Sequence, residues 1–191
     1  MEIRRGQPLD SLKGLNASGV ILAVPPRAIE QITGTRLPPL HPARAASLDL
    51  GLCTLPSGAT RFALGVDRPL YFSRHSATAK LAPAGAELVH VAKYLRDGED
   101  GSGARAELEA FADLVMPGWQ RTADVVRFLP NMTVMQTIAA PEGRPGVDAA
   151  GIDGVAIAGD WVGPEGMLAD AAVASALRAA DMVQRRKVKA A

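Results

Sequence analysis

The hydrophobic positions of this chain form short runs separated by glycine, proline and polar residues. Residues 20–24 are a continuous aliphatic run that ends at two prolines, which predicts a strand buried on both faces. Residues 27–32 predict a short helix between those prolines and Gly34. Towards the other end, residues 155–158 predict a last strand and residues 167–184 a last helix.

The middle of the chain has a different pattern, in which apolar positions alternate or cluster between turn signals. One segment, residues 104–116, predicts a one-sided surface helix that ends at Pro117. The other apolar segments predict the strands of an antiparallel sheet. They lie at residues 48–55, 61–66, 70–73, 87–95, 125–129 and 132–138, the last two on either side of Pro130 and Asn131.

The order of these elements predicts the fold class. A buried strand and helix at each end, with an antiparallel sheet between them, indicate an α/β (α+β) protein in which the two ends share one sheet. We therefore expect residues 1–40 and 140–191 to form one domain and residues 41–139 to form an inserted lobe.

Composition narrows the class of protein further. With 191 residues, 48% of them hydrophobic, and a formal net charge of +1, the chain reads as an ordinary soluble protein with no electrostatic bias towards nucleic acid. The basic residues at 184–189 are interpreted as a solvated helix end. The chain shows no signal peptide and no run long enough to span a membrane, so we expect a cytoplasmic protein. Its single cysteine, Cys53, excludes an internal disulfide and is expected to be a buried strand residue.

Residues 154–181 carry the clearest chemical signal. Gly159, at the end of the last strand, has no Cβ and allows a ligand to approach the backbone. Asp160 supplies a carboxylate that accepts hydrogen bonds from hydroxyl groups. The helix expected to start at Met167 directs unpaired amide groups and the positive end of its dipole at whatever precedes it.

In residue type, order and spacing, residues 158–175 resemble the closing segment of flavoprotein oxidoreductases, a superfamily that includes amine oxidases and phytoene-desaturase-like dehydrogenases. The resemblance implies FAD as the cofactor and a partial FAD-binding Rossmann-like sheet with an antiparallel substrate lobe. It implies that Gly159 and Asp160 meet the ribityl–pyrophosphate part. The backbone from Gly166 through Met167, Leu168 and Ala169 would meet the flavin ring, and Trp161 either covers the cofactor or packs.

The same comparison brings out differences from the family. Ala171 and Ala176 stand where the family often has glycine, and Ala171 is expected to add a methyl group near the ring. Amine-oxidising members commonly place an aromatic residue at the position of Leu168, so the resemblance argues against an amine substrate. Residues 20–26 and 71–83 resemble the family more loosely.

The Gly-rich fingerprint that holds the ADP half of the cofactor in this family is missing. One formal match to GxGxxG starts at Gly101, but acidic residues precede it, and we interpret it as a flexible polar loop before a helix. Three explanations stay open: a truncated gene product, a subunit completed by a partner chain, or a domain that has lost the cofactor.

Side-chain candidates for catalysis are few. His75 and His90 have the chemistry of bases, although a partly buried, hydrogen-bonded histidine is the default. Lys80 and Lys93 have the chemistry to orient a substrate, and a solvated surface lysine is the default for them. The leading hypothesis is a FAD-dependent oxidoreductase that dehydrogenates an apolar or small organic substrate. The alternative is a non-catalytic or subunit-type interaction domain that needs a partner chain.

Overall fold

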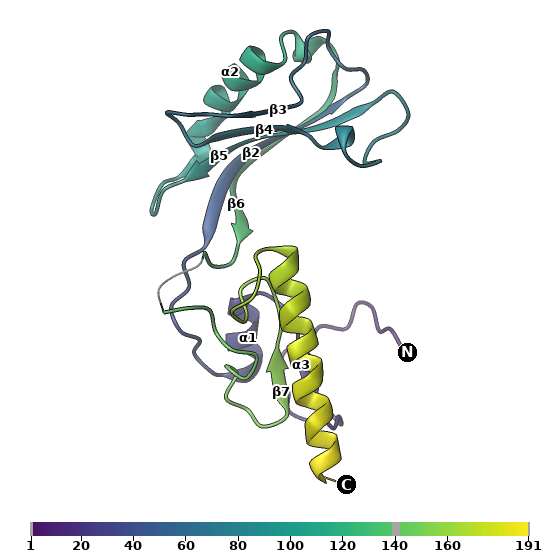
Figure 1. Cartoon of the computed structure of the whole chain (residues 1–191), viewed down its shortest axis with the longest axis vertical. Helices are drawn as coiled ribbons and strands as arrows, with labels where there is room; N and C mark the ends of the chain where they lie inside the picture. The colour runs from purple at the N-terminus through teal and green to yellow at the C-terminus, as the bar shows by residue number, and fades with distance from the viewer. Residues whose placement is uncertain (1, 139–141, 191) are drawn as a thin grey trace. The chain divides into compact units, whose positions relative to one another are not determined.

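The computed structural model describes residues 2–138 and 142–190, with side chains up to residue 185. The chain divides into two compact units. Unit one comprises Met1–Pro42 and Met135–Ala191, and unit two comprises Ala43–Val134. Figure 1 shows the elements of each unit. The boundary expected between residues 139 and 140 lies outside the described residues.

Unit one contains a small parallel sheet. Strand β1 (Val20–Leu22) pairs with β7 (Val155–Ile157) in the register Val20 to Val155 and Leu22 to Ile157. Helices α1 (Pro26–Thr33) and α3 (Ala169–Ala190) follow these strands. The prediction that the two ends of the chain share one sheet is therefore confirmed, as is the mixed α/β class.

The core of unit one gathers around β7 and α1. Its buried members are Leu22, Ile29, Leu37, Ala150, Val155, Ile157, Trp161 and Val162. The expectation that residues 20–24 are buried on both faces is wrong, because β1 has only one neighbouring strand and Ile21 is 42% exposed. At the end of α1, Gly34 takes a left-handed conformation (φ +72°) and its N–H caps the carbonyl of Glu30.

Helix α3 packs through its small residues. Ala171, Ser175 and Ala179 are buried at a spacing of four, so they lie on one face of the helix. Ala179 contacts Ala156 and Ala158 of the β7 segment. The helix begins at Ala169 and not at residue 167 as predicted, because the backbone just before it turns through a positive φ.

Unit two is an antiparallel sheet covered on one face by a helix, as predicted (Figure 1). Helix α2 (Arg105–Val115) packs on this sheet. Three short 3-10 helices, His75–Ala77, Gly101–Ala104 and Trp119–Arg121, connect the elements. The strand order is β3 (Phe62–Leu64), β4 (Leu70–Arg74), β5 (Glu87–Leu95), β2 (Ala43–Leu52) and β6 (Ala123–Met135).

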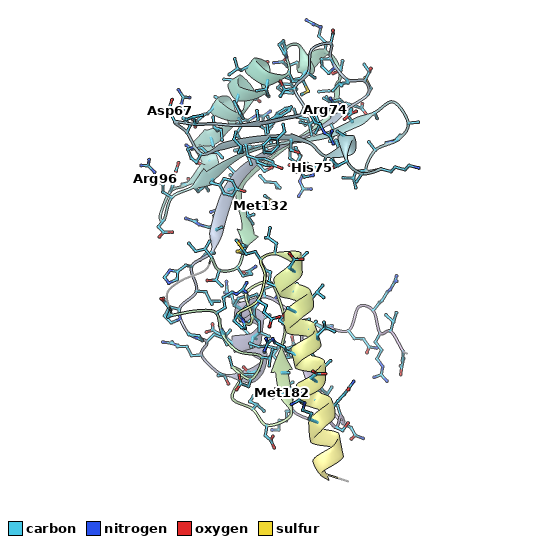
Figure 2. All side chains as sticks on the ribbon, viewed as in Figure 1. Asp67, Arg74, His75, Arg96, Met132 and Met182 are labelled. Atoms are coloured by element: carbon cyan, nitrogen blue, oxygen red, sulfur yellow. The ribbon has the colours of Figure 1, made fainter. Side chains whose placement is uncertain are left out.

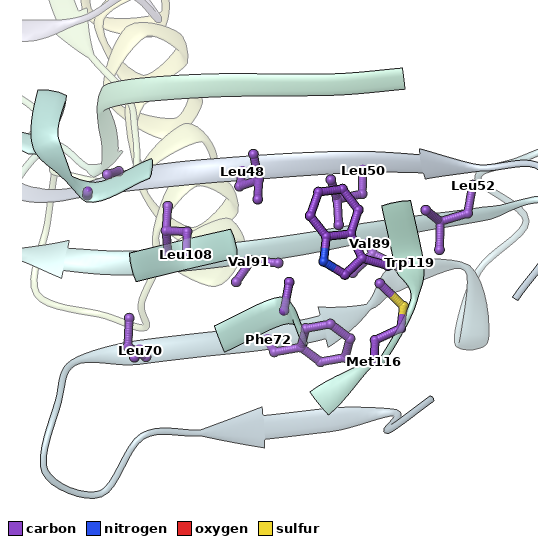
Figure 3. Close-up of a cluster of buried hydrophobic side chains, with 13 residues drawn as sticks. Leu48, Leu50, Leu52, Leu70, Phe72, Val89, Val91, Leu108, Met116 and Trp119 are labelled. Atoms are coloured by element: carbon purple, nitrogen blue, oxygen red, sulfur yellow. The ribbon is translucent and has the colours of Figure 1, made fainter. Parts of the chain in front are cut away.

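Alternate residues of the strands fill the core of unit two (Figure 3). The sheet contributes Leu48, Leu50, Leu52, Leu70, Phe72, Val89 and Val91, and the segment from α2 to the last 3-10 helix contributes Leu108, Ala112, Met116 and Trp119. Because side chains alternate between the faces of a strand, the residues between these core positions lie on the face opposite α2.

Three predictions for unit two are wrong. The strands expected on either side of Pro130 are one strand, β6, and proline is tolerated there because β6 lies at the edge of the sheet. Cys53 is exposed, since β2 ends one residue before it. The segment from Gly101 is a 3-10 helix that runs directly into α2, so the helix start expected there is confirmed and the loop is wrong. Asp100 caps this 3-10 helix by accepting a hydrogen bond from the backbone N–H of Ser102 at 3.1 Å.

Gly101 is buried, and a Cβ there would collide with the carbonyl oxygen of Pro130. Packing inside unit two therefore requires this glycine. Among the helices of the described residues, none is long and apolar enough to cross a membrane.

Candidate active site

A cavity of about 340 Å³ lies at the carboxyl ends of β1 and β7 in unit one. Ligands of parallel α/β sheets bind outside the carboxyl ends of the strands. This β1–β7 cavity is lined by Ala23, Val24, Pro25, Gln136, Ala158, Gly159, Asp160, Trp161, Ala172 and Ala176. Gly159, Asp160 and Trp161 thus all line one cavity, at the end of the sheet where this rule places a ligand.

The backbone of Gly159 is fastened to α3. Its N–H donates to the Ser175 hydroxyl at 3.0 Å, and the same hydroxyl lies 3.0 Å from the carbonyl oxygens of Gly159 and Ala172. A Cβ at Gly159 would lie 2.6 Å from Nε1 of Trp161. The packing of Trp161 therefore gives this glycine a structural reason of its own, next to the close approach of a ligand.

Trp161 belongs to the core of unit one. Only 1% of its surface is exposed, and it packs in the cluster that contains Leu22, Ile157 and Val162. Trp161 also lines the β1–β7 cavity. Trp161 was expected either to cover the cofactor or to pack in the core, and packing accounts for most of its surface.

Asp160 is the acidic side chain of the cavity. Its Oδ2 accepts a hydrogen bond of 3.3 Å from the backbone N–H of Gln136. Among the described residues, none donates a hydrogen bond to its Oδ1. One carboxylate oxygen is therefore oriented by the backbone, and the other is available to a hydroxyl group in the cavity.

Arg144 holds the loop between Asp160 and Gly166. Its Nε donates to the Gly163 carbonyl at 2.6 Å and its Nη1 to the Asp160 carbonyl at 3.1 Å. Its Nη2 donates to the carbonyls of Glu165 and Gly166 at 2.8 and 2.9 Å. The planar guanidinium has donors in a fixed fork, so one side chain sets the course of the whole loop. The sequence offered no local signal for this role, because Arg144 stands in a Gly/Pro-rich loop outside the motif.

The loop then enters α3 through a strained backbone. Gly166 has a φ of +65°, and a Cβ there would lie 2.7 Å from Cβ of Asp170. Leu168 has a φ of +52°, and no other non-glycine residue of the described chain has a positive φ. Strained conformations of this kind cluster at ligand-binding and catalytic sites.

The start of α3 presents free backbone donors. Among the described residues, no group accepts a hydrogen bond from the amides of Met167, Leu168 or Ala169. The side chains of Met167 and Leu168 are 58% and 48% exposed. Ala171, expected to add a methyl group near a cofactor ring, is fully buried in the packing of α3, whereas Ala176 lines the cavity.

The candidate bases and cations lie in unit two. His90 is partly buried and hydrogen-bonded to Asp49, as expected. The His75 ring contacts the His90 ring at a tilt and has no hydrogen bond among the described residues. Lys80 is exposed, as expected.

Lys93 differs from the expected solvated lysine. Its Nζ lies 2.9 Å from Glu99 and 3.1 Å from Glu107. Hydrogen bonds to Glu99 and then to Glu107 raise the pKa of Lys93 above its ordinary value. No cluster of three or more metal-ligating side chains is present in the described parts of the chain.

Comparisons with known proteins give a fold and no family. No family model matches the chain, and no curated protein matches it. An oxidoreductase from Methanosarcina mazei superposes on 87% of the chain with a TM-score of 0.56 at 14% identity. The chain shares the fold of the matched part of that oxidoreductase. A protein from Pyrococcus furiosus superposes on 89% of the chain with a TM-score of 0.56 at 15% identity.

The length of the match is also informative. The chain spans 43% of the Methanosarcina mazei chain and 41% of the Pyrococcus furiosus chain. Nearly all of these 191 residues therefore superpose on less than half of either solved protein.

Proposed function

We propose that these residues are part of a FAD-dependent oxidoreductase that dehydrogenates an apolar or small organic substrate. The observation that carries the proposal is the carboxylate of Asp160 in the β1–β7 cavity, which is followed in the chain by a fixed loop and then by free amides at the start of α3. Gly166, Met167, Leu168 and Ala169 are not among the residues that line the cavity. The fold shared with an oxidoreductase supports it.

The residues present fit the central part of a flavin. Ribityl hydroxyl groups need an acceptor, and Oδ1 of Asp160 has no other described partner. A flavin ring gains negative charge near N1 and C2=O on reduction, and free amides at the positive end of a helix dipole stabilise that charge. We assign the first role to Asp160 and the second to the backbone of Met167, Leu168 and Ala169. Bound there, the flavin supplies the hydride acceptor.

The side chains of this chain then have the roles of binding the cofactor and orienting the substrate. Leu168, with no aromatic ring to enclose an amine, favours an apolar substrate. Arg144 keeps the loop from Asp160 to Gly166 in place, and this fixes the position of the Asp160 carboxylate relative to the free amides. A further segment or a partner chain would supply the group that binds the ADP half of FAD, and the match to less than half of the solved proteins supports this part of the proposal.

Flavin retention tests the proposal. The protein is purified alone and together with the products of neighbouring genes, and flavin absorbance is measured. Asp160→Ala should lower flavin affinity roughly tenfold or more, because a hydroxyl loses a charged acceptor. Asp181→Ala, on an exposed part of α3, should leave it unchanged. If neither preparation of the unmodified protein carries flavin absorbance, cofactor binding is abandoned.

A second candidate function is an interaction domain that binds a partner chain. Ile21 of β1 and Val173 and Leu177 of α3 are 42%, 60% and 65% exposed, which favours a covered surface on unit one. Light scattering tests this alternative with and without the neighbouring gene products. A protein that stays monomeric in every mixture contradicts it.

A further inference from the structure

The face of the unit-two sheet opposite α2 carries a polar row in its centre. Ser73 of β4 is paired with His90 of β5, and His90 with Asp49 of β2. Their strand neighbours Phe72 and Leu48 point into the core, so these three side chains point to the other face. His75 follows directly after β4, on the 3-10 helix (Figure 2).

The members of this row are in contact. His90 Nδ1 lies 2.7 Å from Oδ1 of Asp49, and the Ser47 hydroxyl donates to the same oxygen at 2.7 Å. The ring centroids of His75 and His90 are 4.2 Å apart, with an angle of 52° between the ring planes. We call Ser47, Asp49, His75 and His90 the polar cluster.

The hydrogen bonds fix the roles of the two imidazoles. A carboxylate only accepts, so Nδ1 of His90 carries the hydrogen and Nε2 is left as its basic nitrogen. Asp49 thereby holds His90 in one tautomer and one orientation. The His75 ring has no hydrogen-bond partner among the described residues, so both of its nitrogens are open to a ligand.

The surroundings of His75 favour its neutral form. Burial lowers the pKa of His75, the neighbouring His90 lowers it further, and Asp49 acts in the opposite direction. The nearby charges of Arg74 and Glu87 are paired with each other at 3.1 Å. His75 is therefore available as a proton acceptor in its neutral form, and the Asp49 carboxylate is the neighbouring group that favours the added proton.

We propose that the polar cluster is a proton-accepting site for an aromatic substrate that carries an acidic hydroxyl group. The proton of the substrate O–H moves to a ring nitrogen of His75, which uses its lone pair to form the new N–H bond. The electron pair of the broken O–H bond stays on the substrate oxygen. Asp49 is a positioning residue whose carboxylate stabilises the resulting imidazolium, and its contact with His90 holds that carboxylate in place.

The surroundings of the cluster favour an aromatic substrate. Phe62 and Tyr71 lie on the same face of the sheet, with an edge-to-face contact of 5.6 Å between ring centroids. Phe62 is 52% exposed, and it is paired with Ser73 in the row that contains His90. An aromatic ring therefore finds apolar surface next to a basic nitrogen.

The test uses para-nitrophenol, whose phenolate is yellow and whose neutral form is colourless, and it needs no flavin. The chain has three histidines, so the imidazole resonances of His41, His75 and His90 are assigned with single variants. Near pH ~6.5, where a free imidazole is half protonated, the protein should increase the phenolate fraction of the bound probe. The probe should shift the resonances of His75 and His90 and leave His41 unchanged.

Variants sharpen the result. His75→Gln should abolish the increase in phenolate and weaken probe binding roughly tenfold, because an ion pair with hydrogen bonding is lost. The matched control His41→Gln changes an exposed histidine of unit one and should behave as the unmodified protein. Asp49→Asn should give an intermediate phenolate fraction.

Three outcomes overturn the proposal: no probe binding, binding without a shift of His75, or an unchanged phenolate signal in His75→Gln. The resonance shifts in the unmodified protein decide the case even if a variant does not fold. If the protein holds no flavin but ionises the probe, the proposed function is wrong and the polar cluster is still supported as a proton-accepting site.

Discussion

The two candidate sites of this protein differ in what they are made of. The β1–β7 cavity of unit one offers mostly backbone groups, held in place by Arg144 and Ser175. The polar cluster of unit two consists of side chains on paired strands and on the turn that follows one of them. A backbone site is sensitive to the course of a loop, whereas a side-chain site on a sheet is sensitive to the packing below the sheet.

The two tryptophans allow each unit to be followed by itself. Trp119 is buried in unit two and Trp161 in unit one. Nε1 of Trp119 is buried without a hydrogen-bond partner in the described structure, so Trp119→Phe loses no hydrogen bond and leaves Trp161 as the fluorescent probe. Trp161→Phe leaves Trp119 as the probe of unit two.

The largest effect is expected from Phe72→Ala. Phe72 is fully buried beneath the sheet that carries the polar cluster, so its truncation should lower the free energy of unfolding of unit two by about 3–5 kcal/mol. Denaturant titration with Trp119 fluorescence measures the change. Leu64→Ala is the control, since Leu64 is 60% exposed and should cost less than about 0.5 kcal/mol. Equal effects of the two variants would contradict the described core.

Arg144→Gln should have the next largest effect. It removes a guanidinium that donates to four loop carbonyls, so unit one should lose about 1.5–3 kcal/mol in a Trp161 titration. Amide hydrogen exchange over residues 160–170 should rise in the same variant. The control Arg185→Gln changes an exposed arginine of α3. It should alter neither the stability of unit one nor the amide exchange of residues 160–170. An unchanged exchange rate would mean that the loop does not depend on Arg144.

The difference between the sites also explains what the sequence predicted. Runs of apolar residues placed the strands around Val155 and Leu50, and the segment around Gly159 and Asp160 stood out as a motif, because these signals are local in the chain. Arg144 makes its bonds to residues 16 to 22 positions away, and Asp49 and His90 are 41 positions apart. No local pattern marks such contacts.

Errors in the predicted fold have a similar origin. Pro130 predicted a turn between two strands, yet it lies within one edge strand, whose edge position depends on the pairing of the whole sheet. Cys53 was expected to be buried, and it is exposed because β2 ends at Leu52. Burial on both faces was expected for residues 20–24, and Ile21 is exposed because its sheet has two strands. Each error concerns the neighbours of a segment and not its own residues.

Gly159→Ala tests whether the contact with Trp161 requires a glycine at this position. The added Cβ would come within 2.6 Å of the Trp161 indole, so unit one should lose about 1–3 kcal/mol through overpacking. Trp161 fluorescence should also change in the folded state, since the indole must move. Gly103→Ala in unit two is the matched control, because no atom lies within 4 Å of its Cβ position. A similar loss in both variants would assign the effect to the backbone and not to Trp161.

The smallest effect concerns the charge network of unit two. Hydrogen bonds to Glu99 and Glu107 raise the pKa of Lys93 in the folded state, so the stabilisation is fully present below the pKa of the unfolded chain, about 10.4. This stabilisation is lost as the pH rises through the higher pKa that Lys93 has in the folded state. The free energy of unfolding of unit two, followed by Trp119, should therefore fall as the pH rises above about 10.4. Lys93→Gln should remove that part of the slope, and Lys80→Gln, at an exposed position, should retain it. Because the network is local to unit two, the Trp161 transition should show no difference between these two variants.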